Sequence, residues 1–173
     1  MNILVTGGEG FIGKKLVSKL IQEGHNVTSL DFKPTADIIV DLSDENFDFN
    51  CVDNIDYIFH LAAQPGGYSS LNDPYTDGKW NCLGTINVVK LAQKLKVKKL
   101  IYISSMAIYG NQELAGENLM GKNKPTPISF YGVSKFTGEL YTKLIYEHSG
   151  IPYTIFRLFA TYGSGQDLEN KHQ

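Results

Sequence analysis

Three residues in the second half of the chain have the types and spacing that suit acid–base chemistry on a hydroxyl group. Tyr131 and Lys135 lie four positions apart in a segment with helical character, so their side chains share one face. Tyrosine has a pKa of about 10, and its use as a base near pH 7 requires about 4 kcal/mol of phenolate stabilisation, toward which a lysine cation acts. Ser105 follows a predicted strand and is placed to hold a substrate hydroxyl against Tyr131. Singly, each fits a turn or a solvated helix face; together with a nucleotide-binding fold they favour catalysis.

The elements that would position these residues start with a glycine-rich stretch at residues 2–13. A short apolar strand runs into closely spaced glycines and then into an amphipathic helix, an order typical of dinucleotide-binding folds. The glycines allow a sharp turn and a close approach to a pyrophosphate, and the helix N-terminus offers free N–H groups. Two registers of the glycine motif are possible, because Gly10 and Gly13 can follow either Gly8 or Gly7 as the first glycine. The alternative to a dinucleotide-binding motif is a glycine-rich turn that binds no ligand.

Asp31 stands at the end of the next predicted strand, 26–30, about 20 residues beyond the glycines. A carboxylate at this place accepts hydrogen bonds from the adenosine ribose of NAD and repels the 2′-phosphate of NADP, which favours NAD. Lys33 nearby weakens that preference, and a plain turn residue is the other interpretation of Asp31.

Strands alternate with helices along the rest of the chain, a pattern typical of an α/β fold with a doubly wound parallel sheet. His60, at the end of a strand, is predicted to be a packed structural residue. The segment 64–77 is either a loop that touches substrate or an ordinary surface loop, and a brief helical turn is expected from Ser43. A loop rich in Gly, Asn and Pro leads to Ser129. The remaining predicted strands are 37–40, 55–60, 98–104 and 151–158, and the helices are 11–23, which Gly24 ends, 79–95, and 129–149, which Ser129 caps.

The predicted helix 79–95 has apolar residues around much of its circumference and no charged residue between Lys79 and Lys90. Such a helix requires burial on more than one side. One side would lie on the sheet, and we expect the other to meet a partner subunit. Coverage by another part of the same chain is the competing explanation.

The composition excludes several classes of protein. The chain has 173 residues, of which 42% are hydrophobic and 20% charged, enough for one buried domain. Its net charge of -2 gives no footprint for nucleic acid or an anionic membrane. Cys51 and Cys82 suggest neither a disulfide framework nor a metal site. Without a signal peptide or an apolar run long enough for a bilayer, the expected location is cytoplasmic.

The chain resembles the extended short-chain dehydrogenase/reductase family, the group of NAD-dependent nucleotide-sugar epimerases and dehydratases. The resemblance covers the whole length and implies a Rossmann-like sheet. It implies that the glycine register is Gly7, Gly10 and Gly13. It rests on the motifs Thr6-Gly7-Gly8-Glu9-Gly10-Phe11-Ile12-Gly13, Asp31, Asp41-Leu42, His60-Leu61-Ala62-Ala63, Asn81-x-x-Gly84-Thr85, Ser105 to Gly110, and Tyr131-x-x-x-Lys135.

The resemblance also implies roles for particular residues. The catalytic set is Ser105, Tyr131 and Lys135. Asp31 would bind the adenosine ribose, Asp41 and Leu42 would border the adenine, and Lys135 would also bind the nicotinamide ribose. The full cofactor-binding set is Gly7, Gly10, Phe11, Ile12, Gly13, Asp31, Asp41, Leu42, Leu61, Ala62, Ala63, Asn81, Ser104, Tyr131 and Lys135. Relatives usually dimerise through the helices that correspond to 79–95 and 129–149, which predicts a homodimer.

Departures from the family pattern narrow the reaction. Dehydratases carry an acidic pair directly after the position of Ser105, where this chain has Met106 and Ala107, so dehydration is not expected. Epimerisation needs only the base and the cofactor. The family often has asparagine at the position of Ala160 and proline at that of Ser164, so a contact to the substrate diphosphate is expected to differ.

The expected function is therefore that of an NAD-dependent nucleotide-sugar epimerase of the 4-epimerase type, with a nucleotide sugar as substrate. Relatives continue well beyond the position of Gln173, so we expect residues 1–173 to be a truncated NAD(P)-binding domain whose substrate-binding domain is absent. Such a chain would bind NAD and turn over sugar nucleotide poorly. The alternatives are a non-catalytic NAD(P)-sensing module on the same fold and an NADP-linked reductase or a dehydratase.

Overall fold

Six strands and the helices between them alternate along the chain in a computed structural model that describes residues 1–111 and 124–166. The strands are β1 (Asn2–Thr6), β2 (Asn26–Asp31), β3 (Ile38–Ile39), β4 (Tyr57–His60), β5 (Lys99–Ser105) and β6 (Tyr153–Leu158). The helices are α1 (Phe11–Gln22), α2 (Gly67–Asn72), α3 (Pro74–Asp77), the π-helix η1 (Gly78–Leu83), α4 (Gly84–Leu95), the 3₁₀-helix η2 (Met106–Tyr109) and α5 (Phe130–Ser149).

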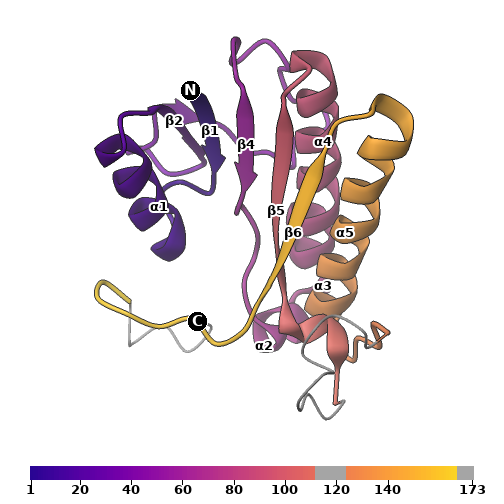
Figure 1. Cartoon of the computed structure of the whole chain (residues 1–173). Helices are drawn as coiled ribbons and strands as arrows, with labels where there is room; N and C mark the ends of the chain where they lie inside the picture. Colours follow the sequence, from indigo (N-terminus) through magenta and orange to yellow (C-terminus); the bar gives the residue numbers. More distant parts are fainter. Residues whose placement is uncertain (112–123, 167–173) are drawn as a thin grey trace.

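The strands form one sheet in the order β3-β2-β1-β4-β5-β6, and every neighbouring pair is parallel. The order reverses beside β1, which is the switch point where doubly wound sheets bind ligands at the carboxyl ends of their strands. In Figure 1 these ends point downward, toward α2. The expected Rossmann-like α/β fold is confirmed.

Alternate residues of the strands enter two different cores. Leu4, Ile58 and Leu100 pack with α4 and with Ile145 of α5 in the larger cluster. Ile3, Val5 and Phe59 face the opposite way and pack with Leu20 and its neighbours on α1. The helices therefore cover both faces of the sheet, and α4 and α5 lie side by side on one of them (Figure 1).

Two helices match their predicted bounds closely. In α1, Glu23 is the C-cap and Gly24 follows it at φ +81°, the left-handed backbone that glycine adopts readily. At the start of α5, the Ser129 hydroxyl accepts a hydrogen bond from Gly132 N at 3.0 Å, as its predicted capping role requires.

The segment after β3 does not form the helical turn that was predicted from Ser43. Instead, Asp41, Asp44 and Asp48 each accept a hydrogen bond from the backbone N–H two residues ahead, at 2.8 Å. Aspartates that bond their own backbone in this way favour turns over helix. The strand predicted at 37–40 is correspondingly shortened to Ile38–Ile39.

The predicted loop 64–77 contains α2 and α3, with Pro74 in the first turn of α3 and the Asp73 side chain accepting from Thr76 N at 3.0 Å. The predicted helix 79–95 begins in the π-helix η1 and becomes α-helical at Gly84. Most of the loop predicted between Gly110 and Ser129 lies outside the described residues, and the residues just before it, Met106–Tyr109, form η2. Within the described ranges, no helix has the length and apolar character needed to cross a bilayer.

Candidate functional site

The glycine loop between β1 and α1 is shaped by two close backbone approaches. Gly7 has φ +70°, and a Cβ placed there would lie 2.6 Å from Ala62 N, beyond the end of β4. A Cβ on Gly13 would lie 2.0 Å from the carbonyl oxygen of Gly7. Gly10 is less confined, with 3.2 Å to the same oxygen, and its N–H donates to that oxygen at 3.0 Å. Side chains at positions 7 and 13 would therefore fill the cradle that a diphosphate requires.

Gly8, the first glycine of the alternative register, is also confined. A Cβ on Gly8 would lie 2.7 Å from Cβ of Ser29 on β2. This contact joins positions far apart in the chain, so glycine spacing alone did not reveal it. Beyond the loop, Gly10 caps α1, and the first-turn N–H groups of Phe11 and Ile12 have no partner within the helix.

Asp31 ends β2 next to this loop and is 7% exposed. Its two carboxylate oxygens accept hydrogen bonds from Glu9 N at 3.1 Å and from Lys33 N at 3.2 Å. Each oxygen keeps capacity for a further donor such as a ribose hydroxyl. The ammonium of Lys33 donates to the Glu9 carbonyl at 3.1 Å, which fixes this lysine across the loop.

Asp41 and Leu42 follow β3 at the same edge of the sheet. The Asp41 carboxylate accepts from the Ser43 hydroxyl at 2.6 Å and lies 3.7 Å from Lys79 Nζ. Partial burial raises the pKa of Asp41, but the bonds from Ser43 and the charge of Lys79 outweigh it and keep that pKa below its usual value. The Leu42 carbonyl accepts from the Asn87 amide at 2.8 Å, which ties this turn to α4.

The residues after β4 lie beside the glycine loop. Leu61 N donates to the Thr6 carbonyl at 3.0 Å, and Ala62 N approaches the Thr6 hydroxyl at 3.4 Å. Leu61, Ala62 and Ala63 are all partly exposed. These three residues thus line one side of the space next to the glycine loop.

Ser105 and Tyr131 are brought together although they are far apart in the sequence. Ser105 ends β5, Tyr131 lies in the first turn of α5, and the two side chains are close enough for Ser105 to lower the pKa of Tyr131. The Tyr131 backbone N–H donates to the Ser70 hydroxyl at 3.1 Å, which links α5 to α2. Burial raises the pKa of Tyr131, the Ser105 hydroxyl lowers it, and the charge of Asp77 raises it, with a net upward shift.

The net shift of Tyr131 differs from the expectation that Lys135 would depress it. Desolvation of a phenolate and a nearby carboxylate both favour the protonated phenol. Ser105, and not Lys135, supplies the lowering contribution in this structure. Any use of Tyr131 as a base therefore requires additional positive charge or hydrogen bonding.

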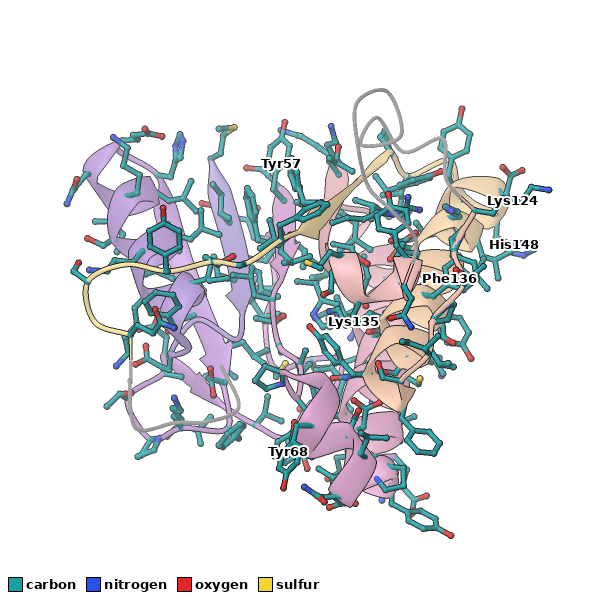
Figure 2. All side chains as sticks on the ribbon, turned by 90° about the horizontal axis from the view of Figure 1, so that it is seen from below. Tyr57, Tyr68, Lys124, Lys135, Phe136 and His148 are labelled. Atoms are coloured by element: carbon teal, nitrogen blue, oxygen red, sulfur yellow. The ribbon has the colours of Figure 1, made fainter. Side chains whose placement is uncertain are left out.

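Lys135 is 3% exposed and points between α5 and the sheet (Figure 2). Its Nζ lies 4.5 Å from the centre of the Tyr102 ring. Burial lowers the pKa of Lys135 to about 8, and the charges of Asp77 and Glu139 oppose that shift. Among the residues that the structure describes, none accepts a hydrogen bond from this ammonium, so its donors are available to a ligand.

Two further buried polar atoms have no hydrogen-bond partner among the described residues, Ser104 Oγ and Gln64 Oε1. Buried polar groups without partners are uncommon and call for an explanation. Together with the Lys135 ammonium and the glycine cradle, they fit a polar, hydroxyl-bearing ligand such as a dinucleotide.

Asn81, by contrast, has its amide engaged by protein groups. Its Oδ1 accepts from Gln64 N at 2.8 Å, and its Nδ2 donates to Asp77 Oδ1 at 2.9 Å and to Ser134 Oγ at 3.0 Å. The Gln64 carbonyl is a further acceptor at 3.2 Å. Asn81 therefore joins the segment after β4 to α3 and α5, and it holds the site's walls together.

Four residues that the sequence analysis did not single out surround the reacting groups. Asp77 is 1% exposed, and burial raises its pKa although Ser134, Lys135 and Asn81 lower it. Tyr102 underlies Lys135, and a Cβ on Gly138 would lie 2.1 Å from the Tyr102 hydroxyl. Glu139 is four residues beyond Lys135, a spacing that could have revealed it, whereas the other three depend on tertiary contacts.

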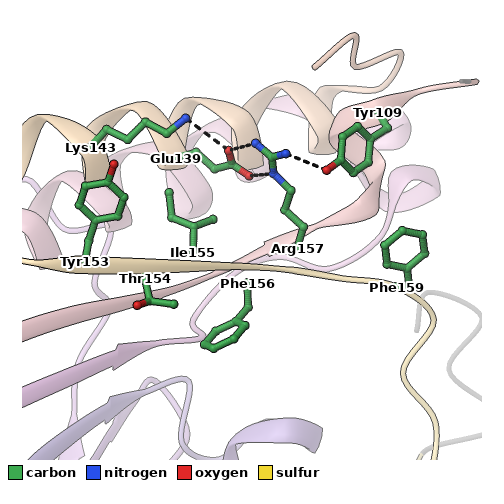
Figure 3. Close-up of a pocket in the computed structure, with 9 residues that line it drawn as sticks. All are labelled: Tyr109, Glu139, Lys143, Tyr153, Thr154, Ile155, Phe156, Arg157 and Phe159. Carbon is green, nitrogen blue, oxygen red and sulfur yellow. Dashed lines mark hydrogen bonds and ion pairs between the residues drawn. The ribbon is translucent and has the colours of Figure 1, made fainter. Parts of the chain in front are cut away.

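Glu139 is buried and forms an ion pair with the partly exposed Arg157, and the resulting cluster joins α5, β6 and η2 (Figure 3). Arg157 donates from Nε and Nη2 to the two Glu139 oxygens at 2.8 Å, and from Nη1 to the Tyr109 hydroxyl at 2.7 Å. These bonds raise the pKa of Arg157. A hollow of about 590 Å³ along β6 is lined by these three residues and does not include Ser105, Tyr131 or Lys135.

His60 is a packed structural residue, as predicted. It is 1% exposed, between the hydroxyls of Thr6 at 2.7 Å and Thr85 at 3.0 Å. Burial, with a smaller contribution from Lys135, lowers the pKa of His60 to about 3. The imidazole is therefore neutral at pH 7.

Comparison with known proteins places these features in a family. The profile described as "NAD dependent epimerase/dehydratase family" matches residues 3–173. A putative UDP-glucose 4-epimerase of Methanocaldococcus jannaschii is 37% identical over 95% of this chain and 57% of its own length.

Solved structures agree with that match. The UDP-glucose 4-epimerase of Thermotoga maritima, solved with UDP-glucose, superposes with a TM-score of 0.87 at 34% identity, covering 96% of this chain and 58% of that one. The Thermus thermophilus UDP-glucose 4-epimerase complex with NAD gives 0.82 at 31% identity, with the same coverage. The chain thus spans somewhat more than half the length of these relatives.

Proposed function

Because the chain belongs to the NAD-dependent epimerase/dehydratase family, we propose that it carries the cofactor-binding and reacting residues of a nucleotide-sugar 4-epimerase. One observation carries this proposal. The glycine cradle, Asp31 and the neighbouring side chains of Ser105 and Tyr131 all lie at the carboxyl edge of one parallel sheet. That edge, beside the switch point at β1, is where such sheets bind dinucleotides.

The residues proposed to bind NAD fall into groups according to the part of the cofactor that each would contact. Gly7, Gly10 and Gly13, with the N–H groups of Phe11 and Ile12, would receive the diphosphate. Asp31 would bind the adenosine ribose, and Asp41 and Leu42 would border the adenine. The wall and the nicotinamide side would be formed by Leu61, Ala62, Ala63, Asn81, Ser104, Tyr131 and Lys135, of which Asn81 acts by holding the other segments in place.

The bound cofactor supplies an acceptor and donor of hydride and a positive charge close to Tyr131. Tyr131 removes the proton from the sugar hydroxyl and later returns it. Ser105, whose hydroxyl lowers the pKa of the neighbouring Tyr131 phenol, orients the same sugar hydroxyl. Lys135 would direct its free ammonium protons at the nicotinamide ribose.

Epimerisation is favoured over dehydration by the residues after Ser105. Met106 and Ala107 open the short η2 helix, and neither can donate a proton to a departing hydroxyl. The Ser105 side chain accepts from Ala107 N at 3.2 Å, so η2 is held against the reacting residue. A non-catalytic NAD-sensing module would have no need of Ser105 beside Tyr131.

We also propose a homodimer through the helices at 79–95 and 129–149. Val133, Leu140 and Leu144 are 50%, 45% and 47% exposed, and their spacing places them along one side of α5. An exposed apolar stripe of this kind is typical of a protein interface. Light scattering after size-exclusion chromatography should give twice the chain mass, and a monomer at micromolar concentration would refute the dimer.

The function is tested by cofactor binding together with a product screen. Calorimetric titration should show NAD binding to the chain more tightly than NADP, because Asp31 repels a 2′-phosphate. The protein that carries this chain should then convert UDP-glucose, or a related nucleotide sugar, into its C4 epimer, followed by NMR of the sugar protons. Absence of NAD binding, or a preference for NADP, would overturn the proposal.

A further inference from the structure

The only tryptophan of the chain, Trp80, packs against Phe32 at the edge of the sheet proposed to bind the cofactor. The ring centroids of Trp80 and Phe32 are 5.6 Å apart and the rings are tilted by 34°. Phe32 follows Asp31 directly, and 59% of it is exposed. The Phe32 ring therefore has one side against Trp80 and further surface that is open to a ligand.

The neighbours of this aromatic pair are polar groups with proposed roles at the adenosine end of NAD. Asp31 precedes Phe32 in the chain. Lys79 precedes Trp80 and lies 3.7 Å from the Asp41 carboxylate. Carboxylates can bind ribose hydroxyls or an exocyclic amine, but they do not cover the flat face of a base. Phe32 lies between Asp31 and Asp41 in the sequence, and its exposed ring offers the flat apolar surface that these carboxylates lack.

Resting on the proposed function, we infer that Phe32, backed by Trp80, is the surface on which the adenine of the cofactor stacks. The distance between the two rings decides whether the adenine lies between them or on the outer face of Phe32. A base inserted between them would need about 3.5 Å of contact distance on each side, or about 7 Å in all. Since the centroids are only 5.6 Å apart, the adenine lies on the outer face of Phe32, and Trp80 holds that ring in place.

Binding measurements with parts of the cofactor test this inference. Stacking of a base on an aromatic side chain contributes enough that Phe32→Ala should weaken NAD and AMP binding about 5-fold or more in calorimetric titrations. Nicotinamide mononucleotide, which lacks adenine, should bind the variant and the wild type equally. Tyr75→Ala is the matched control, because Tyr75 is 89% exposed on α3 and outside the aromatic pair; it should leave all three affinities unchanged.

Fluorescence gives a second readout that does not depend on activity. In the double variant Phe32→Trp/Trp80→Phe, the single tryptophan stands at the proposed stacking position, and AMP should quench it. The double variant Tyr75→Trp/Trp80→Phe places the single tryptophan on α3, where AMP should not quench it. Circular dichroism should show that each variant is folded, and the two double variants are compared with each other because both carry Trp80→Phe at a partly buried position.

The outcomes separate this inference from the proposed function. If wild-type protein binds NAD but Phe32→Ala binds NAD and AMP equally well, and AMP leaves the single tryptophan of the first double variant unquenched, the stacking surface is refuted while the cofactor site stands. If the wild type binds neither NAD nor AMP, the proposed function itself fails.

Discussion

The hydroxyl of Thr6 lies 2.7 Å from Nδ1 of His60, across the pair of strands that meets the glycine loop. Thr85 fixes the direction of this bond, because its hydroxyl proton is donated to the Asn81 carbonyl at 2.5 Å. Thr85 must therefore accept from His60 Nε2–H at 3.0 Å, which leaves Nδ1 to accept from Thr6. One neutral tautomer of His60 thus connects Thr6 of β1 to Thr85 in the first turn of α4.

Acid should destabilise the fold through His60. Its pKa of about 3 in the folded protein lies below the unfolded value of about 6.5, so the unfolded state binds more protons. This contribution to stability is complete above pH 6.5 and is lost as the pH falls toward 3. Urea unfolding should show a fall of about 1.4 kcal/mol per pH unit between pH 6 and 4 from this residue.

His60→Gln isolates that contribution from the carboxylates, which titrate in the same range. The variant should be less stable at pH 7 but should lose less stability on acidification than the wild type. His148→Gln, at an exposed position near the end of α5, is the control and should follow the wild-type pH dependence. Parallel pH profiles for His60→Gln and wild type would show that His60 is protonated in the folded state.

Gly13→Ala should destabilise the protein and abolish NAD binding, because its methyl group would meet the Gly7 carbonyl oxygen at 2.0 Å. The clash with backbone should cost about 2 kcal/mol or more. Gly78→Ala is the matched control, since Gly78 is helical with φ −61° and a Cβ there meets no described atom within 4 Å. It should gain about 0.5–1 kcal/mol from helix propensity. Thermal unfolding measures the stability of the two variants, and titration measures their NAD affinity. Equal stability and equal NAD affinity of Gly13→Ala and Gly78→Ala would contradict the close approach at Gly13.

Loss of Arg157 should cost more than loss of its partner Glu139. Arg157→Met leaves a carboxylate that is fully buried, at a cost of about 3–5 kcal/mol, with Lys143 at 3.9 Å and the more distant Lys135 as cations that act on it. Glu139→Gln leaves a guanidinium whose side chain is 21% exposed and can reach water, so about 2 kcal/mol is expected. Chemical denaturation of both variants gives the order, and the reverse order would contradict the burial seen here.

Asp77→Asn should lower the pKa of Lys135 below about 8, because Asp77 is the largest opposing charge at this ammonium. The other groups acting on Lys135 in the same direction are Glu139 and Cys82, which the variant leaves intact. The pH dependence of Lys135 labelling by an amine-reactive reagent, followed by mass spectrometry, should move to lower pH. Labelling of the half-exposed Lys143 on the same helix should not move, and an unchanged Lys135 profile would refute the coupling.

Local patterns predicted the elements well, because glycines, caps and helical spacing act within a few residues. Ser129 and Gly24 show this at two helix ends. The spacing of Tyr131 and Lys135 placed both on α5, but it did not predict their electrostatics. Burial and the charge of Asp77, which comes from α3, decide the pKa of Tyr131.

Tertiary contacts also explain the other differences between the prediction from sequence and the structure. Ser43 looked like a helix cap, yet the side chains of Asp41, Asp44 and Asp48 form successive turns, and Leu42 and Phe47 are buried within that segment. The need for glycine at position 138 arises from the Tyr102 hydroxyl on another element. Contacts of this kind depend on the assembled sheet and have no signature in local spacing.

The most direct test of the account is Tyr131→Phe, compared with wild type for both NAD binding and epimerisation in the protein that carries this chain. The phenol acts on the sugar hydroxyl, so the variant should bind NAD within about 3-fold of wild type while the rate of epimer formation falls by about 10²–10⁴. Epimer formation by Tyr131→Phe at close to the wild-type rate would contradict the assignment of Tyr131 as the base and, with it, the proposed catalytic site.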